Sequence, residues 1–447
     1  MSGERRKAVI LGAAGRDFHD FNTVYRGDPS VEVVAFTAAQ IPFIERRIYP
    51  PELAGPLYPE GIPIRLESGL EDLVRQHGVD LVVLAYSDLS HEQVMHLASR
   101  SLALGADFLL LGPERTMLRS REPVVSVCAV RTGCGKSGVA RLIVRALRAA
   151  GGRPVVLRHP MPYGDLLSER VERFGSLEDL DRFHCTVEER EEYELHIRAG
   201  AVVYSGVDYA DILARAEEEA DVLVWDGGNN DLPFLRPDLE IVVLDPHRPG
   251  HELAYHPGEA NLRRAHIAVV NKVDTARPED VERVEQNVRG VNPCATIVRA
   301  ASTITVENPE QIRGKTVLAV EDGPTVTHGG MAYGAAALAA KRYGAAALAD
   351  PRPYARGSLA EAYRKHTHLG SLLPALGYSA GQLEELRQAI DDTPCDLVLV
   401  GTPVDLKTLL GFRRPAIRVR YEVEELGGDV LRQRARELLS RSEGSHG

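Results

Sequence analysis

A lysine and a serine that follow a glycine-rich turn are the side chains of this sequence best suited to bind a phosphate. Lys136 and Ser137 come directly after the turn at 131–135. An apolar run at 124–130 precedes the turn, and residues 138–148 are apolar at helical spacing. Glycines let backbone N–H groups approach phosphate oxygens, and a helix N-terminus adds partial positive charge. Strand, glycine turn, Lys-Ser and helix together predict a phosphate-binding loop.

In such a loop the lysine bridges the β- and γ-phosphates of a nucleotide, and the hydroxyl ligates Mg²⁺. We therefore expect Lys136 to act in catalysis and Ser137 to bind the metal. The residues expected to contact the nucleotide here are Thr132, Gly133, Cys134, Gly135, Lys136, Ser137 and Gly138. The first glycine of the usual consensus is replaced by Val130, which is similar to the variant loop of dethiobiotin-synthetase-like proteins.

An aspartate at the end of a second apolar run is the candidate partner of this loop. Residues 220–225 are mostly apolar and lead directly into Asp226. A carboxylate at the end of a strand beside a phosphate loop holds Mg²⁺ through water. Asp226 is therefore the second predicted metal ligand. The Gly-Gly-Asn-Asn run at 227–230 predicts a flexible loop near the γ-phosphate.

A tetrapeptide after a third apolar run predicts the site of the nucleotide base. Asn271, Lys272 and Asp274 follow residues 266–270 and form the pattern Asn-Lys-x-Asp. In G-proteins the carboxylate of this pattern binds guanine, and the lysine stem packs on the ring. In the variant phosphate-loop class the asparagine can also bind adenine. The pattern therefore predicts a purine nucleotide, with ATP expected and GTP as the alternative.

Cationic side chains fall on loops at the predicted strand ends of the same region. Phosphoryl transfer requires charge on the phosphate oxygens to be neutralised. The candidates for this role, beside Lys136, are Arg131, Arg158, His159 and Arg248. The chain carries a net charge of −11, so a small anionic substrate would need such a local cluster.

The bulk composition excludes several classes of protein. The negative net charge argues against a general nucleic-acid binder, and no window approaches the 18 apolar residues of a membrane span. Five scattered cysteines without a metal-binding spacing are typical of a reducing compartment. A length of 447 residues indicates two or three domains. We expect a cytoplasmic enzyme that forms a homodimer and binds neither nucleic acid nor membrane.

Alternating apolar runs and helical spacings predict an α/β fold in three parts. Residues 1–122 are expected to form a Rossmann-like parallel sheet domain. Residues 123–312 are expected to form the nucleotide-binding core, a dethiobiotin-synthetase-like P-loop NTPase domain. Residues 313–447 are expected to form a C-terminal α/β extension that completes the nucleotide or substrate site.

Four further segments allow a structural and a functional interpretation. The polar run 16–22 is either a capped helix start with a solvated face or a small-anion site. The acidic run 188–194 is typical of a solvated helix face, and the alternative is that one carboxylate joins the metal shell. Residues 321–330 are either a turn with a helix cap or a ligand loop. A seven-residue repeat, 333–339 and 343–349, is rich in alanine and predicts close helix packing.

The motifs as a set resemble those of the cyclic 2,3-diphosphoglycerate synthetase family, whose members are also described as predicted GTPases. The resemblance covers nearly the whole chain. The segments that carry it are 12–22, 131–137, 158–165, 226–231, 248–250, 271–274 and 320–325.

The resemblance implies ATP- and Mg-dependent closure of 2,3-diphosphoglycerate into a cyclic pyrophosphate, with ADP and phosphate released. Lys136, Ser137 and Asp226 would then bind Mg–ATP, while Asn271 and Asp274 would face the base. Two alternatives remain open. One is a GTP-hydrolysing switch or chaperone protein, and the other is an ATP-dependent kinase or ligase that acts on another phosphorylated metabolite.

Overall fold

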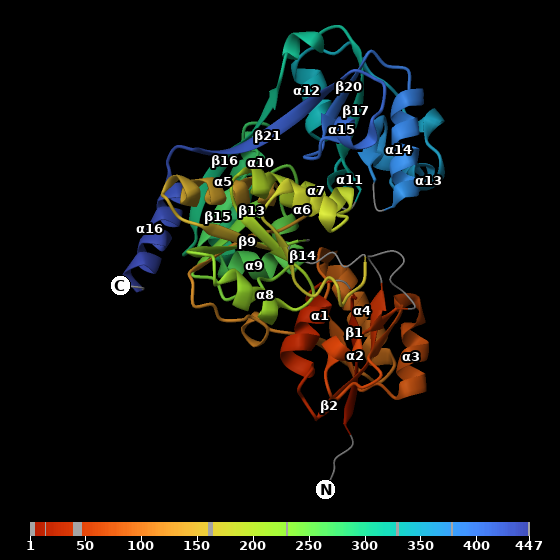
Figure 1. Ribbon diagram of the computed structural model, residues 1–447, viewed down its shortest axis with the longest axis vertical. Helices are drawn as coiled ribbons and strands as arrows, with labels where there is room; N and C mark the ends of the chain where they lie inside the picture. The colour runs from red at the N-terminus through yellow and green to blue at the C-terminus, as the bar shows by residue number, and fades with distance from the viewer. Residues whose placement is uncertain are drawn as a thin grey trace.

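The computed structural model describes residues 5–13, 15–38, 47–159, 164–228, 231–327, 330–376 and 379–445. The chain forms three α/β regions that follow one another along the long axis of the molecule (Figure 1). The N-terminal region, drawn in red and orange, lies at one end, and most of the C-terminal strands and helices lie at the other, whereas the last helix, drawn in dark blue, returns to the side of the central region. The two boundaries, expected after residues 122 and 312, stay a prediction.

The N-terminal region is built on a six-stranded sheet within the described residues, in the order β3-β4-β2-β1-β5-β7. Its strands are β1 (Arg6–Leu11), β2 (Val31–Ala38), β3 (Ile48–Tyr49), β4 (Ile62–Leu66), β5 (Leu81–Leu84) and β7 (Asp107–Leu110). Its helices are α1 (Arg16–Asp20), α2 (Pro51–Ala54), α3 (Leu70–His77) and α4 (His91–Ala103). The local sequence explains where α4 begins, because the Ser90 hydroxyl and the Gln93 side chain form a capping box.

This sheet is mixed, so the expectation of a wholly parallel sheet is corrected. β1, β2, β4, β5 and β7 pair in parallel, but β3 runs antiparallel to β4. β3 contains only two residues, Ile48 and Tyr49, and so gives no apolar run that a sequence pattern can detect.

The central region continues the pattern of mostly parallel strands and covering helices. Its strands are β8 (Val124–Ala129), β9 (Pro154–Arg158), β10 (Glu172–Phe174), β11 (Val202–Ser205), β12 (Val222–Asp226), β13 (Leu239–Leu244), β15 (Ile267–Val270) and β16 (Thr296–Val306). Its helices are α5 (Lys136–Ala149), α6 (Leu177–Arg182), α7 (Val187–Arg198), α8 (Tyr209–Ala216), α9 (Gly258–Arg264) and α10 (Pro278–Val291). Two short strands, β6 (Leu89–Ser90) and β14 (Tyr255–His256), pair with each other and link this region to the first.

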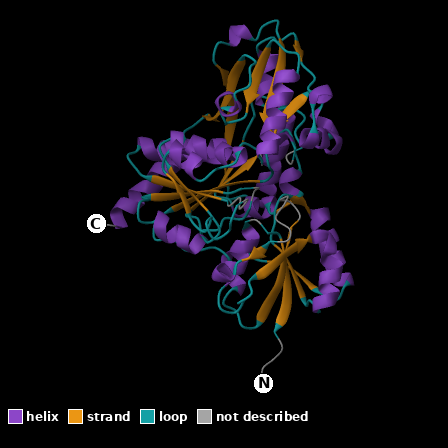
Figure 2. Cartoon of the chain, turned by 45° about the vertical axis from the view of Figure 1, so that its right-hand side comes forward, coloured by secondary structure: helices purple, strands orange, loops and turns teal. Residues whose placement is uncertain are grey.

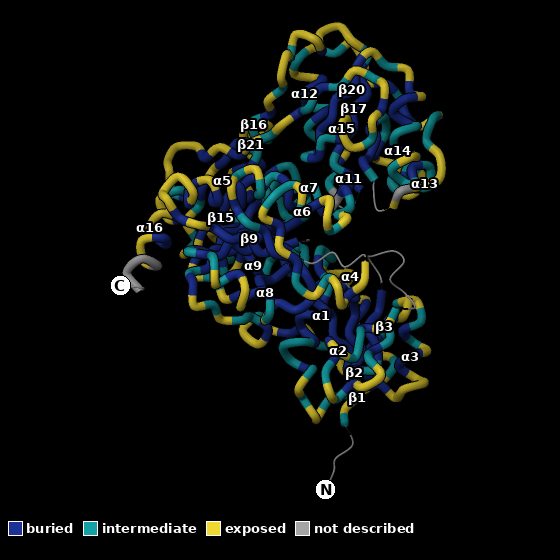
Figure 3. Tube along the Cα trace, viewed as in Figure 1, coloured by how far each residue is buried: buried dark blue, intermediate teal, exposed yellow. Residues whose placement is uncertain are grey.

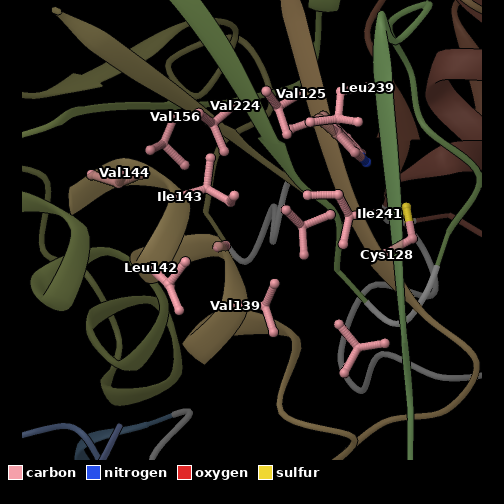
Figure 4. Packing of buried hydrophobic residues seen from close by; sticks show 14 of the residues in the cluster. Val125, Cys128, Val139, Leu142, Ile143, Val144, Val156, Val224, Leu239 and Ile241 are labelled. Atoms are coloured by element: carbon pink, nitrogen blue, oxygen red, sulfur yellow. The ribbon is translucent and has the colours of Figure 1, made fainter. Parts of the chain in front are cut away.

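The phosphate-loop helix is fixed by apolar contacts with the strands beneath it. Val139 and Ile143 of α5 point toward Val125 of β8, Val224 of β12 and Ile241 of β13 (Figure 4). All five side chains are fully buried. Strands buried on both faces have continuous apolar sequences, which is why the runs around β8 and β12 were visible in the sequence.

The C-terminal region adds further strands to the same sheet. Its strands are β17 (Thr316–Asp322), β18 (Ala347–Leu348), β19 (Leu372–Ala375), β20 (Leu397–Gly401) and β21 (Ala416–Leu426). Its helices are α11 (Gly323–Val326), α12 (Ala335–Arg342), α13 (Gly357–Lys365), α14 (Ala380–Asp392), α15 (Leu406–Leu410) and α16 (Val430–Ser445). Within the described residues one 13-stranded sheet runs through both regions.

Two long strands join the central and C-terminal regions. β16 and β21 pair antiparallel from Arg299 opposite Leu426 to Val306 opposite Val419, and β21 then pairs in parallel with β20. Both strands extend from the centre of the molecule into the upper region (Figure 1). α16 then packs with α5 in the central hydrophobic cluster. The C-terminal extension is therefore continuous with the nucleotide-binding core through a mixed sheet.

Helices cover the strands in every region (Figure 2), and the buried parts of the chain follow the strands (Figure 3). In the part of the chain that the structure describes, no helix has the length and apolar character needed to cross a membrane.

Candidate functional site

The predicted phosphate loop connects β8 to α5 and turns through two glycines. Gly133 and Gly135 have φ values of +82° and +97°, in the left-handed region that favours glycine. A Cβ at Gly135 would also collide with the Asn271 side-chain amide. The backbone conformation at both positions, and the close approach of Asn271 at Gly135, therefore explain why the turn contains glycines.

Two of the three residues expected to bind the base hold this loop in place. The Asn271 side chain is fully buried, and its Nδ2 donates to the Cys134 carbonyl at 2.9 Å. Lys272 Nζ donates to the Gly133 carbonyl at 2.5 Å. Asp274 is exposed, and its carboxylate accepts the backbone N–H of Ser302 at 3.1 Å. Asn271 and Lys272 thus contact the phosphate loop, whereas Asp274 lies at the surface.

Arg248 supports the loop from a neighbouring strand end. Its guanidinium donates to the Thr132 carbonyl at 2.8 Å and to Asp245 Oδ2 at 3.0 Å. The same Asp245 oxygen lies 3.0 Å from Lys272 Nζ. Both cations reach backbone carbonyls of the loop, so Arg248 and Lys272 fix its conformation.

Arg131 connects the phosphate loop with the N-terminal region. Its Nε donates to Oδ1 of Asp88, which follows β5, at 2.7 Å. Its guanidinium carbon lies 3.8 Å from the centre of the Tyr255 ring, and one terminal nitrogen lies 3.0 Å from His251 Nδ1. The carboxyl end of the first sheet therefore faces the phosphate loop.

The predicted lysine and aspartate meet directly. Lys136 Nζ lies 2.5 Å from Asp226 Oδ1, and Asp226 is fully buried at the end of β12. The other carboxylate oxygen lies 2.8 Å from both Arg158 NH1 and His196 Nε2. Arg158 also pairs with Glu192. Two cations, two carboxylates and an imidazole thus form one network behind the loop.

The charge of Asp226 is held by these neighbours. Burial alone would raise the pKa of its carboxyl, but the Arg158 and Lys136 charges and the hydrogen bond from His196 hold that pKa well below its usual range. Burial lowers the pKa of His196, so its imidazole is neutral near pH 7. Asp226 is therefore a permanent anion beside the loop at physiological pH.

One member of this network, Glu192, comes from the acidic run that was expected to be a solvated helix face, and His196 follows that run on the same helix. The run forms most of α7, in which Glu191, Glu194 and His196 are buried. α7 also contacts the C-terminal region, because Glu191 accepts the Thr402 hydroxyl, while His196 contacts Asp226 within the central region. The solvated-face interpretation is therefore corrected. Both sides of this helix are buried, and an acidic run in the sequence gives no signal of that burial.

His159 lies between the N-terminal region and the β12 loop. Its Nδ1 is 2.6 Å from Asp231 Oδ2, and the carboxylate is almost fully buried. A Cβ at Gly15 would collide with the imidazole, and so would one at Gly228. Glycine at these two positions leaves the space that the ring occupies. Residues 160–163, 229–230 and 328–329, which the sequence placed in candidate loops, lie outside the described residues.

The polar run 16–22 is mostly buried against the central region, which corrects the interpretation of a solvated face. Arg16 donates to the Leu232 carbonyl at 3.1 Å, and the His19 ring stacks on Phe234 with centroids 4.1 Å apart. Asp20 lies 3.5 Å from Arg16. These residues join the two regions.

The buried carboxyl of Asp20 is expected to make stability fall as pH rises. Burial raises its pKa to about 7 despite the Arg16 charge. Between about pH 4 and about pH 7 the folded protein holds a proton that the unfolded chain releases, so the free energy of unfolding decreases across this window. Asp20→Asn removes the titration and should gain stability relative to wild type from about pH 4.5 to about pH 7.5. Urea unfolding of wild type and Asp20→Asn at about pH 4.5 and about pH 7.5 measures the free energy of unfolding of each protein. A difference between the two proteins that does not change with pH would contradict the prediction.

The loop after β17 brings the C-terminal region to the phosphate loop. Asp322 caps α11 by accepting the Thr325 N–H at 3.2 Å. Glu321 is buried and accepts N–H groups at the start of α12. A Cβ at Gly133 would lie 3.5 Å from Thr325. The segment is a helix cap, and it also lies against the nucleotide motif.

The expected metal ligands are Ser137, at the start of α5, and Asp226. Among the described residues, no group of three or more His, Cys, Asp or Glu is arranged to hold a metal ion. Mg²⁺ is usually held by one or two carboxylates together with substrate phosphates and water. One hydroxyl and one ionised carboxylate beside a phosphate loop fit that pattern.

Comparisons with known proteins point to a different product from the one expected. No protein-family model matches the chain. The arginine synthetase ArcE of Thermococcus kodakarensis is 58% identical over 430 residues, or 96% of each chain. The cyclic 2,3-diphosphoglycerate synthetase of Thermococcus gammatolerans is 25% identical over 283 residues, covering 56% of this chain and 63% of that protein. Among solved structures, LpxK from Aquifex aeolicus in complex with ATP is similar with a TM-score of 0.45 at 14% identity. The match covers 83% of this chain and 99% of that one.

The much closer likeness to ArcE contradicts the expected synthesis of cyclic 2,3-diphosphoglycerate, and the expected substrate is wrong with it. Many of the segments that carried the earlier resemblance, such as 131–137 and 271–274, form or support the phosphate loop. Enzymes with different substrates share such nucleotide motifs.

Proposed function

The chain belongs to the family of the arginine synthetase ArcE, and from this premise we propose that it is an ATP-dependent ligase that forms arginine. The observation that carries the proposal is this relationship across nearly the whole chain. The paired Lys136 and Asp226 at the phosphate loop support the use of a nucleoside triphosphate.

The chemistry of the product suggests the second substrate. The guanidinium group of arginine differs from a ureido group in one atom, because a nitrogen stands where the ureido group has its oxygen. L-citrulline is the amino acid with that ureido group. A ureido oxygen is a poor leaving group, so its replacement by ammonia requires activation. ATP supplies that activation by phosphorylation.

The proposed reaction has two steps. The ureido oxygen attacks the γ-phosphorus of ATP, and the bond to the β-phosphate oxygen breaks to release ADP. Ammonia then attacks the ureido carbon, and inorganic phosphate leaves with the former ureido oxygen. Loss of a proton gives arginine, so citrulline, ammonia and ATP yield arginine, ADP and phosphate.

The chain's own residues have separate roles in this proposal. Lys136 neutralises the β- and γ-phosphates, and backbone N–H groups of 133–138 cradle them. Ser137 and Asp226 would hold Mg²⁺, which supplies further neutralisation of phosphate charge when bound. Arg158 shares Asp226 with Lys136 and is the second cation of the site. Arg131 and Arg248 position the loop, since both are already engaged with its neighbours.

His159 is the proposed proton acceptor for the nitrogen substrate. Ammonium must lose a proton before it can attack carbon, and imidazole is the side chain most often used for such a transfer. The Asp231 carboxylate lies 2.6 Å from Nδ1 and so contacts the ring directly. His159 follows β9, whose last residue, Arg158, contacts Asp226. The proposed proton acceptor, His159, and the phosphate loop therefore border one site.

The test is an assay of the full-length protein with Mg–ATP, L-citrulline and ammonium chloride. We expect arginine, ADP and phosphate in equal amounts, and no product when either citrulline or ammonium is omitted. Replacing citrulline with 2,3-diphosphoglycerate should give no turnover. Nucleotide hydrolysis without arginine would favour the switch protein instead, and formation of AMP would contradict the proposed cleavage between the β- and γ-phosphates. The homodimer and the domain boundaries remain proposals.

A further inference from the structure

A cavity of about 700 Å³ lies between the nucleotide-binding core and the C-terminal region. Its walls come from the loops after β13 and β15, from α12 and β18, and from the segment 368–372. Small-molecule sites in proteins typically measure about 300–1,000 Å³. The cavity therefore has the size of a ligand site, and no role has so far been given to it.

The seven-residue repeat noted in the sequence builds much of this cavity. The first copy contributes Tyr333, just before α12, and Ala337 and Leu338 within it. The second copy contributes Ala345, Ala347 and Leu348, and the last two of these form β18. Both copies line the same space although one is helical and the other extended. The alanines among them leave room that a larger residue would fill.

One wall of the cavity belongs to the segment that supports the phosphate loop. His247 lines the cavity, and its Nε2 lies 2.9 Å from the hydroxyl of Thr275, another lining residue. The next residue, Arg248, donates to the Thr132 carbonyl of the loop at 2.8 Å. On this side, a residue that lines the cavity is therefore followed directly by a residue that binds the phosphate loop.

The C-terminal part of the lining also reaches the loop. Tyr333 lines the cavity, and Met331, two residues earlier, lies against Gly133. Lys272, three residues before the lining Thr275, donates to the same glycine's carbonyl at 2.5 Å. Segments from both regions therefore converge on Gly133, and the cavity lies beside the loop.

The lining chemistry fits an uncharged heteroaromatic ring. The His247 and Tyr333 rings are 5.9 Å apart at their centroids, and burial lowers the pKa of His247, so its imidazole is neutral near pH 7. None of the described residues that line the cavity is an aspartate or glutamate. The α-ammonium group of an amino-acid substrate would find no carboxylate there. Aromatic, alanine and leucine side chains with a few hydroxyl and imidazole groups suit a purine, and Lys341, which also lines the cavity, adds a hydrogen-bond donor for its ring nitrogens.

We propose that this cavity holds the purine base of the nucleotide whose phosphates bind at 131–137. The proposal rests on the proposed function, because it assumes that ATP is a substrate. It moves the base from the side chains of Asn271 and Asp274 to a pocket completed by the C-terminal region. The Asn-Lys-x-Asp motif then serves mainly to hold the loop.

A matched pair of substitutions tests the assignment in the full chain. Ala347→Phe adds a ring at a position that lines the cavity, whereas Ala346→Phe adds the same ring at an equally exposed neighbour that does not line it. Calorimetry compares the binding of Mg–ATP with that of Mg–tripolyphosphate, which has the phosphates but no base. We expect Ala347→Phe to weaken ATP binding by about tenfold or more, equivalent to about 1.4 kcal/mol. Binding of tripolyphosphate should be unchanged, and Ala346→Phe should behave as wild type.

The outcomes separate this inference from the function on which it rests. If wild type binds ATP and Ala347→Phe binds it equally well, the base lies elsewhere and only the inference fails. If Ala347→Phe weakens both ligands equally, the substitution disturbs the phosphate loop and the assignment is again overturned. If wild type binds no ATP, the proposed function fails together with the inference. Thermal unfolding of both variants checks that each is folded.

Discussion

Lys136→Ala is expected to lower kcat for arginine formation by about 10²- to 10³-fold, the loss typical of removing one preorganised group from a charged transition state. Lys136 is the cation that the loop presents to the β- and γ-phosphates, and it is anchored by Asp226 at 2.5 Å. Asp226 keeps Arg158 and His196 as partners in the variant, so the fold should persist. Steady-state formation of arginine and ADP measures the effect.

Arg145→Ala is the matched control for this variant. Arg145 lies on the same helix, α5, but on its exposed side, where it pairs with Glu422. Its removal should leave kcat within about twofold of wild type. If Lys136→Ala retained wild-type kcat, or if Arg145→Ala lost as much, the phosphate loop would not be the site of catalysis.

Asp226→Asn is expected to lower the free energy of unfolding by about 3–5 kcal/mol, because it leaves buried cations without their counter-ion. Asp226 has no exposed surface, and it contacts Lys136, Arg158 and His196. An amide of the same shape cannot balance their charge. Urea unfolding of the two proteins at neutral pH measures the difference.

Asp221→Asn provides the comparison, because Asp221 stands directly before the same strand. Its partner, Arg153, is more than half exposed, so the pair is solvated and its loss should cost about 0–1 kcal/mol. Equal losses in the two variants would contradict the role of the buried network. The contribution of Asp226 should persist down to about pH 4, since its folded pKa lies below the unfolded value, and be lost only in more acid solution.

The strand, turn and helix around 131–137 and the position of Asp226 could be predicted because their signals are local. The loop at 131–137 has a strand before it and a helix after it, and Asp226 ends an apolar run; both patterns are complete within about 15 residues. Asn271 and Lys272 were recognised by type, but a pattern cannot tell whether an amide faces a base or a backbone carbonyl. In the structure Asn271 contacts the Cys134 carbonyl.

The remaining features depend on contacts between distant parts of the chain. The pairing of β16 with β21 joins residues more than 100 positions apart, and neither strand shows its partner in the sequence. The burial of α7 depends on Asp226, at the end of another element of the central region, and on Thr402 of the C-terminal region. The substrate was mispredicted because the recognised motifs concern the nucleotide, whereas the substrate is selected by side chains that no motif identified.

The fate of the ureido oxygen tests the central claim most directly. Citrulline labelled with oxygen-18 in the ureido group is converted with ATP and ammonium, and the phosphate formed is analysed by mass spectrometry or phosphorus NMR. If the ureido oxygen attacks the γ-phosphate of an ATP held at 131–137, each phosphate released should carry one labelled oxygen. Arginine formed with unlabelled phosphate, or no arginine at all, would contradict the account.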